Sequence, residues 1–264
     1  MPSLLTDLSP LLPLVREAPF GLITDLDGTI SPLTGTPAEA TISPACRRCL
    51  EAIAGRAALV AVVSGRAVED VRRIVGLEGV VYVGLHGFSL PMPPVWTEAS
   101  MATYAVMTRS ILDDLRRTIA LPGIVFEDKG PLIALHYRPA ADPDAARRTI
   151  LDAIAAAPMA RRFARHEGKM FVELRPPVPS VHKGSVVRYL AAEHGLHSVL
   201  YLGDDVTDVD ACRTLRETTD LRGASIVVAG EETPPEVLAA ADYSVEGVEG
   251  VERLLQGLAT ALGA

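Results

Sequence analysis

Five short apolar runs rich in Val, Ile and Leu recur along this chain, and each is followed by Gly, Asp or Ser and then, in most cases, by a helical pattern. Near-continuous apolar strands that are separated by helices are typical of a parallel β-sheet covered on both faces. We therefore predict an α/β fold with a Rossmann-like parallel sheet, formed by a core domain of residues 1–90 and 181–264. The five runs lie at residues 20–24, 58–63, 80–83, 198–202 and 225–229.

The pattern changes between the third and fourth runs. A proline-rich stretch, SLPMPPVW, leads into a long helical pattern at about residues 98–120. Two strands joined by a KGP turn follow, then a second helix with Asp142 as its N-cap, and then two more strands hinged at Gly168. The order helix, strand, strand, helix, strand, strand favours a compact α+β module with one antiparallel sheet. We predict that residues 91–180 form this module, inserted into the core domain.

Composition excludes several functional classes. The chain has 264 residues, of which 48% are apolar and 22% charged, as in ordinary globular proteins. Its formal charge of −8 repels a polyphosphate backbone, so no nucleic acid partner is expected. No apolar run reaches the length of about 20 residues that spans a bilayer, and the leucine-rich N-terminus lacks a basic region. We predict a cytoplasmic protein without a membrane partner, in which Cys46 and Cys49 stay reduced.

Two aspartates follow the first apolar run, in the stretch FGLITDLDGT. In an open parallel sheet, ligands bind beyond the carboxyl ends of the strands, which is where Asp25 and Asp27 lie. Because side chains alternate along an extended chain, the two carboxylates face one crevice, where they repel each other unless a cation lies between them. Mg²⁺ is the expected ion, since it prefers oxygen ligands and binds few protein groups together with water and substrate phosphate.

A second acidic cluster follows the fourth apolar run, in the stretch VLYLGDDVTDVDA. Its carboxylates belong to Asp204, Asp205, Asp208 and Asp210, after a bend at Gly203. One acidic strand end can be a solvated loop. Two such ends, on strands that neighbour each other in a parallel sheet, imply a shared hard cation.

Two further segments offer groups that a phosphate needs. The second apolar run ends in Ser64, Gly65 and Arg66, where a hydroxyl and backbone N–H groups at a helix start can hold an anion. Lys183 lies at the start of a later helix and can neutralise phosphoryl and carboxylate charge. Each segment alone also fits an ordinary cap or turn, but four such elements in this order favour a phosphate site.

Four motifs, DLDGT, VVSGR, HKG and GDDVTD, resemble those of the haloacid-dehalogenase (HAD) phosphatase superfamily, and the inserted module resembles its C2 type of cap domain. More narrowly, the stretches GLITDLDGTISPL, GLHG, EDKGPLIALHYR, GKMFVELRP and LGDDVTD resemble the trehalose-6-phosphate phosphatase family, over roughly residues 18–215. The resemblance implies a HAD core with an inserted αββαββ cap. It also implies a Mg²⁺-dependent phosphoric monoester hydrolase that acts on trehalose 6-phosphate.

The resemblance assigns roles to the core residues. Asp25 is implied as the nucleophile that forms an aspartyl-phosphate. Asp27 is implied as the group that protonates the leaving sugar oxygen and then activates water, while its backbone carbonyl binds Mg²⁺. Ser64 and Lys183 are implied to hold the transferring phosphoryl group. The implied metal-binding residues are Asp25, Asp27, Asp204, Asp205 and Asp208.

The resemblance also assigns substrate contacts. Thr29 fits as a positioning hydroxyl, and the cap is implied to read the sugar hydroxyls with charged side chains. The alternative for each cap residue is a solvated sheet face. At Val209 the chain departs from the family pattern, in which Glu is frequent, and the acid appears at Asp210 instead, so the resemblance leaves the outer metal shell open. The implied substrate-binding residues are Thr29, Gly65, Arg66, His86, Glu127, Lys129, Arg138, Lys169 and Glu173.

Other functions remain open from the sequence. A phosphatase for another sugar phosphate, of the sucrose-phosphate or mannosyl-3-phosphoglycerate type, would share the core motifs and differ in the cap. A non-catalytic sugar-phosphate sensor would not need Asp25 and Asp27 aligned, and a phosphomutase would retain its phosphorylated intermediate. We expect a monomer or weak dimer whose cap closes over the core.

Overall fold

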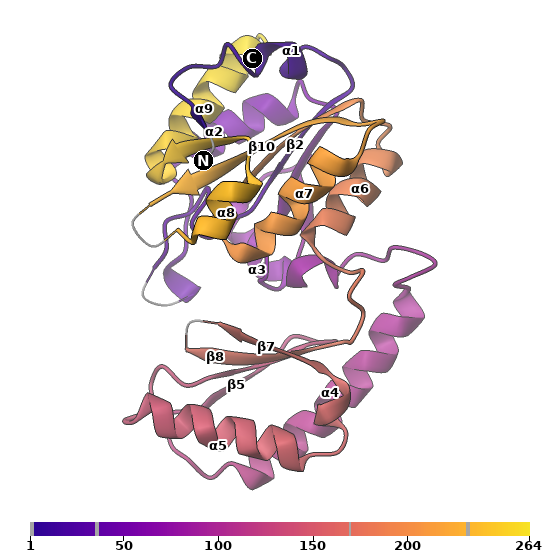
Figure 1. Ribbon diagram of the computed structural model, residues 1–264, viewed down its shortest axis with the longest axis vertical. Coiled ribbons are helices and arrows are strands. Elements are labelled where there is room, and N and C mark those ends of the chain that lie inside the picture. Colours follow the sequence, from indigo (N-terminus) through magenta and orange to yellow (C-terminus); the bar gives the residue numbers. More distant parts are fainter. Residues whose placement is uncertain (1–2, 35–36, 169, 231–232) are drawn as a thin grey trace. The chain divides into compact units, whose positions relative to one another are not determined.

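The computed structural model describes residues 3–34, 37–168, 170–230 and 233–264. The chain divides into two compact units (Figure 1). We call Met1–Leu90 together with Val181–Ala264 the core unit, and Pro91–Ser180 the cap unit. Within the described ranges, no helix combines the length and the apolar character that crossing a bilayer requires.

The core unit is built on a seven-stranded sheet with the order β1-β11-β10-β9-β2-β3-β4, in which all neighbouring strands are parallel. This arrangement confirms the predicted α/β class. The strands β2 and β9, which carry the two acidic clusters at their ends, are direct neighbours. The strands are β1 (Ser3–Leu4), β2 (Phe20–Thr24), β3 (Leu59–Val63), β4 (Val81–Val83), β9 (Ser198–Gly203), β10 (Arg222–Ala229) and β11 (Tyr243–Glu246).

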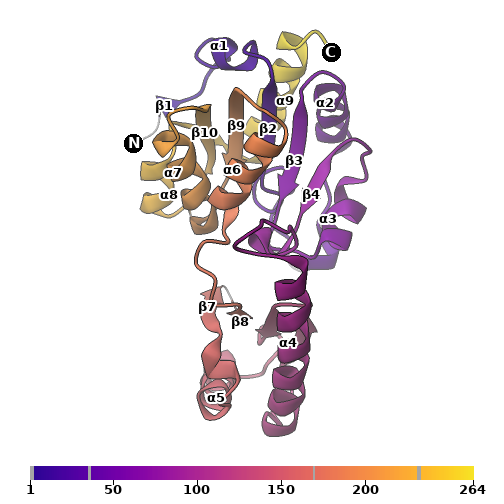
Figure 2. The ribbon, with the colours of Figure 1, turned by 90° about the vertical axis from the view of Figure 1, so that its right-hand side faces the viewer.

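Helices cover both faces of the core sheet (Figures 1 and 2). One face packs on α2, α3 and α9, where Leu22, Val62 and Leu200 of the strands join the main apolar cluster of the unit. The helices α6, α7 and α8 lie on the opposite face. Burial on both faces explains why the central strands read as continuous apolar runs. The helices are α1 (Leu12–Val15), α2 (Pro44–Ala54), α3 (Val68–Val75), α6 (Lys183–Glu193), α7 (Val209–Glu217), α8 (Pro235–Ala240) and α9 (Gly247–Ala261).

The cap unit contains a four-stranded antiparallel sheet with the order β5-β6-β8-β7. Its element order, αββαββ, is the predicted one, and Asp142 caps its second helix by accepting a hydrogen bond from the Ala145 N–H at 2.9 Å. Alternate strand residues such as Leu135 and Val172 pack with helix residues such as Ile111 in a separate apolar cluster. The elements are α4 (Glu98–Thr118), β5 (Val125–Asp128), β6 (Ile133–His136), α5 (Pro143–Ala156), β7 (Ala164–Gly168) and β8 (Phe171–Arg175).

Candidate active site

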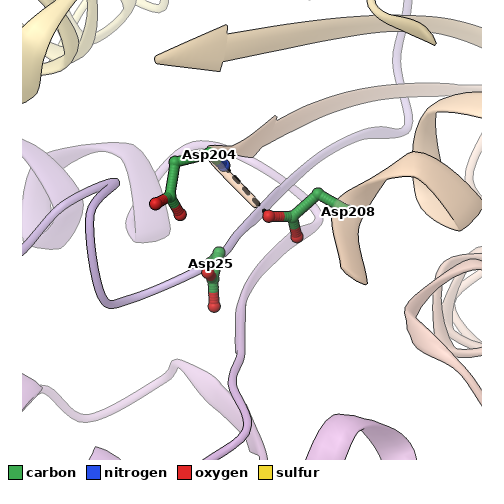
Figure 3. A group of neighbouring side chains, drawn as sticks. All are labelled: Asp25, Asp204 and Asp208. Carbon is green, nitrogen blue, oxygen red and sulfur yellow. Dashed lines mark hydrogen bonds between the residues drawn. The ribbon is translucent and has the colours of Figure 1, made fainter. Parts of the chain in front are cut away.

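The two acidic clusters meet at the carboxyl ends of β2 and β9. Asp25 follows β2 directly and is buried, and its N–H donates to the Leu202 carbonyl of β9 at 2.8 Å. Asp25, Asp204 and Asp208 each offer a carboxylate oxygen within 4.8 Å of the others (Figure 3). Residues far apart in the sequence are thus brought together by the pairing of two parallel strands, as ligand sites in such sheets require.

Asp208 lies at the centre of the hydrogen bonds in this site. It is fully buried, and its Oδ2 accepts from the backbone N–H groups of Asp204 at 3.0 Å and Asp205 at 2.9 Å. Its Oδ1 accepts from Lys183 Nζ at 2.6 Å and from the Tyr201 hydroxyl at 2.5 Å. The carboxylate therefore links β9, the loop after it and the first residue of α6. Asp205 itself is exposed.

Lys183 joins this carboxylate to the candidate nucleophile. Its Nζ lies 3.1 Å from Asp25 Oδ2, and its side chain is only 2% exposed. The lysine is the first residue of α6, and His182 is the N-cap, with Nδ1 accepting from the Ser185 N–H at 3.3 Å. In return the Ser185 hydroxyl accepts from the His182 N–H at 3.0 Å, which completes a capping box.

Local backbone geometry holds Asp204 at the same position. The hydroxyl of Thr29 donates to Asp204 Oδ1 at 3.0 Å. Gly28 has a φ of +77°, and a Cβ there would lie 2.0 Å from Asp204 Oδ2. A glycine is needed for both reasons, since the backbone is left-handed and the carboxylate occupies the space of a side chain. The predicted positioning hydroxyl thus contacts an acid of the metal-binding set.

Charge in the site is unbalanced. Burial raises the pKa of Asp25 well above its ordinary value, although the ammonium of Lys183 opposes this shift. Burial and the neighbouring Asp208 raise the pKa of Asp204 to about 7. For Lys183, burial alone would lower the pKa, but Asp208 and Asp25 together raise it. Three carboxylates around one ammonium suit a hard divalent cation, because oxygen ligands of this kind are those that Mg²⁺ prefers.

The remaining core residues of the prediction lie around Asp27. Arg66 donates to Asp27 with Nε at 2.6 Å and Nη2 at 2.7 Å, a two-point ion pair. Ser64 is buried at the end of β3, and its hydroxyl accepts from the Arg66 N–H at 3.2 Å. A Cβ on Gly65 would lie 2.5 Å from His86 Nε2, so the imidazole covers this glycine closely. Ser64, Gly65 and His86 therefore lie close to one another, and Arg66 connects this group to Asp27.

In the cap unit, three predicted residues meet on the sheet face away from its helices. Glu127 and Glu173 lie in one row across the sheet, on either side of Ala134. Lys129 Nζ reaches Glu173 Oε2 at 3.0 Å and Glu127 Oε2 at 3.6 Å. We call Glu127, Lys129, Glu173, His136 and Arg175 the cap network.

Two unpredicted side chains complete the cap network. His136 Nε2 lies 2.7 Å from Glu127 Oε2, and Arg175 Nε donates to Glu173 Oε1 at 2.5 Å. Burial alone would raise the pKa of Glu173, but Lys129 and Arg175 bring it below its ordinary value. Arg138 is exposed two residues beyond β6, and Lys169 lies outside the described residues.

Sequence reasoning assigned no role to four residues that contact or adjoin the predicted set. They are Tyr201, His182, His136 and Arg175. Tyr201 carries a hydroxyl in the middle of a mostly aliphatic run, and His182 precedes a helix whose third residue is Ser185, so both residues have a recognisable signal in the sequence. His136 and Arg175 depend on the register of the cap strands, which the sequence does not specify.

Comparison with known proteins identifies the family of this chain. Residues 23–249 match the family model described as Trehalose-phosphatase. The trehalose-phosphate phosphatase of Mycobacterium tuberculosis (strain H37Rv) is 33% identical over 201 residues, which cover 71% of this chain and 49% of that protein. The corresponding protein of Mycobacterium avium (strain 104) is 32% identical over 252 residues, covering 89% of this chain and 61% of that one. The chain thus spans about half the length of the curated relatives first matched.

A solved structure agrees with the fold. The C-terminal domain of the trehalose-6-phosphate phosphatase of C. albicans superposes with a TM-score of 0.73 over 98% of both chains, at 21% sequence identity. At this identity the likeness supports the fold alone. Because the family model covers most of the sequence and includes both acidic clusters, the chain belongs to the trehalose-phosphatase family.

Proposed function

We propose that this protein is a Mg²⁺-dependent phosphatase that hydrolyses trehalose 6-phosphate to trehalose and inorganic phosphate. One observation carries the proposal: a buried carboxylate, Asp25, lies at a strand end with an ammonium 3.1 Å away and two further carboxylates within 4.8 Å. The substrate is inferred from the relatives, which are named trehalose-phosphate phosphatases. Membership of the same family supports this choice of substrate. The cap network offers charged groups that can bind sugar hydroxyls.

In the proposed reaction, a carboxylate oxygen of Asp25 attacks phosphorus as the bond from phosphorus to the sugar oxygen breaks. Asp27 gives its proton to that oxygen, and trehalose leaves. Asp27 then takes a proton from water, which attacks the aspartyl-phosphate and releases inorganic phosphate and free Asp25. Because Arg66 binds both oxygens of Asp27, proton donation requires this pair to open.

In the proposed reaction, the other core residues align the phosphoryl group and neutralise its negative charge. Lys183 and Ser64 would bind the phosphoryl oxygens, and little more than alignment is required for phosphoryl transfer. Asp25 and Asp204, with the backbone carbonyl of Asp27, would hold Mg²⁺. When bound, the ion supplies positive charge between the carboxylates and the phosphoryl group. Thr29 would keep Asp204 oriented toward it.

The cap unit would provide the sugar specificity. We propose that residues 91–180 act as the cap domain and that Glu127, Lys129 and Glu173 bind sugar hydroxyls, together with Arg138 and Lys169. The ion pairs of Lys129 with Glu127 and Glu173 hold these three side chains in position before substrate arrives. Ordered charged groups lose less conformational entropy on binding than mobile ones.

Phosphate release from a panel of sugar phosphates tests the proposal. We expect the highest kcat/KM with trehalose 6-phosphate, compared with sucrose 6-phosphate and mannosyl-3-phosphoglycerate, and loss of activity with a chelator that Mg²⁺ restores. Asp25→Asn should lower kcat by at least about a thousand-fold, because the nucleophile is removed. Asp70→Asn, which alters an exposed carboxylate on α3, is the control. Undiminished hydrolysis by Asp25→Asn would refute the mechanism, and faster hydrolysis of another sugar phosphate would refute the substrate.

A further inference from the structure

A tyrosine hydroxyl is buried directly behind the proposed reaction centre. Tyr201 lies in the middle of β9 and is fully buried. Its neighbours Leu200 and Leu202 belong to the main apolar cluster, so the alternation of the strand turns the phenol toward the opposite face. Its hydroxyl donates a hydrogen bond to Asp208 Oδ1 at 2.5 Å.

The contacts of Asp208 show what this hydroxyl does. A carboxylate has about four lone-pair positions. All four are used here: Oδ1 accepts from Tyr201 and Lys183, and Oδ2 accepts from the N–H groups of Asp204 and Asp205. Asp208 therefore acts as a fixed support for its neighbours.

Of the four donors, the Tyr201 hydroxyl is the one that can be deleted without touching the reacting groups. Lys183 contacts Asp25, and the two N–H groups belong to the backbone that carries Asp204. Without the phenol, Oδ1 would keep Lys183 as its donor among the described residues, while Oδ2 would still accept the two backbone N–H groups. The Oδ1 end of the carboxylate would then be less restrained, and the ammonium that it binds would shift relative to Asp25.

We propose that Tyr201 is a positioning residue for phosphoryl transfer: its hydroxyl fixes the orientation of Asp208, and through Asp208 it keeps the ammonium of Lys183 beside Asp25. This inference rests on the proposed function, in which the phosphoryl group is transferred to Asp25. The effect belongs to the phosphoryl end of the substrate, so it should not depend on the sugar.

The first test compares Tyr201→Phe with Tyr82→Phe. Tyr82 lies in the same sheet, on β4. Its hydroxyl donates to the Leu77 carbonyl at 2.7 Å and accepts from the Leu77 N–H at 3.0 Å, so its removal deletes tyrosine hydrogen bonds away from Asp208. Tyr201→Phe should lower kcat about tenfold for both trehalose 6-phosphate and p-nitrophenyl phosphate, with KM changed less than about twofold. Tyr82→Phe should leave kcat unchanged. Equal kcat values for Tyr201→Phe and the wild-type protein would overturn the proposal.

The second test asks whether Tyr201 acts through Asp208. In the Asp208→Asn background, adding Tyr201→Phe should lower kcat by less than about twofold further, because the two changes break one linkage. Independent, multiplying losses would overturn the proposal. A readout without turnover is the rise in the thermal midpoint when Mg²⁺ and beryllium fluoride are added. This rise should be smaller in Tyr201→Phe and unchanged in Tyr82→Phe, and an undiminished rise in Tyr201→Phe would count against it.

Hydrolysis by the wild-type protein distinguishes failure of the proposed function from failure of the role assigned to Tyr201. If it hydrolyses neither ester, the proposed function fails and the role of Tyr201 fails with it. If it hydrolyses either ester and Tyr201→Phe does so equally well, the positioning role alone is wrong.

Discussion

Asp25 and Asp204 gain protons easily in the folded protein because burial and neighbouring carboxylates oppose their negative charge. The ordinary pKa of an aspartate is 3.8, whereas that of Asp204 is raised to about 7. Between these two values the folded chain binds a proton that the unfolded chain has already released. The folded state without metal is therefore favoured by acid in this window, and its stability falls as the pH rises.

We predict that the thermal midpoint of the protein in chelator falls as the pH is raised from about 5.5 to about 8. Mg²⁺ should raise the midpoint more at pH 8 than at pH 5.5, because the ion and the proton compete for the same carboxylates. Below about pH 5.5, the lowered pKa values of Glu127 and Glu173 have the opposite effect on stability, because protonating these carboxylates in acid destabilises the folded state. Thermal unfolding at several pH values, with chelator or Mg²⁺, measures both effects.

The matched variant for this pH experiment is Asp204→Asn, which has no carboxyl proton to gain and should flatten the pH dependence in chelator. A midpoint that rises with pH in the wild-type protein would contradict the assignment.

At the scale of residues, the sequence predicts the site best where polar side chains come directly after buried strands. Asp25 and Asp204 could be paired in advance, because neighbouring parallel strands end at the same edge of a sheet. Tyr201 could not, because its partner is set by a short 3-10 turn, Val206–Asp208, that brings Asp208 back beside β9. The contact of Arg66 with Asp27 was equally hidden, since Arg66 could have reached either a phosphate or a carboxylate.

At the scale of elements, α6 begins at the candidate active site, and the way it begins decides where Lys183 lies. His182 accepts the Ser185 N–H through Nδ1, a role more often filled by Ser, Thr, Asp or Asn. This N-cap residue fixes the first turn of α6, and Lys183 is the first residue of that turn. Helix stability and site geometry are therefore coupled at this residue.

We predict that His182→Ala lowers the free energy of unfolding by about 1 kcal/mol and also lowers kcat with p-nitrophenyl phosphate. His182→Asn should recover most of both losses, because its side-chain oxygen can accept the same hydrogen bond. Denaturant unfolding and steady-state kinetics provide the measurements. His194→Ala, at the exposed opposite end of α6, should change stability by less than about 0.5 kcal/mol. If it proves as harmful as His182→Ala, the capping argument is wrong.

The strands at the β1 end of the core sheet show where periodicity stops being informative. β11 has the sequence YSVE, with no apolar run, and β1 has only two residues. They are strands because β11 pairs with β10, and β1 with β11. The central strands were predictable because both of their faces are buried, whereas β11 and the edge strand β1 depend on tertiary pairing.

At the scale of the whole molecule, each unit has its own apolar cluster. The cap cluster is drawn from both helices and three strands of the cap unit, such as Ile111, Leu135 and Ile150. The cap unit is also continuous in sequence. This two-part organisation left a trace in the sequence because the parallel-sheet pattern stops at the proline-rich stretch and resumes at the lysine motif.

We predict that residues 91–180, produced alone, fold with a cooperative thermal transition, since their core and sheet are complete within that segment. Far-UV circular dichroism and differential scanning calorimetry would detect the transition. Leu135→Ala should destabilise the isolated segment by about 2–5 kcal/mol, as for other buried leucines. The exposed Val106→Ala is the control. A segment without any cooperative transition would show that the cap unit needs the rest of the chain.

The place of β2 between β3 and β9 has a consequence for protein synthesis. β3 emerges from the ribosome soon after β2, but β9 follows only when the entire cap segment has been translated. Until then, the other side of β2 presents free backbone N–H and C=O groups to solvent, a situation that invites intermolecular strand addition. Nascent chains that stall before β9 therefore lack the second acidic cluster and also carry an aggregation-prone edge.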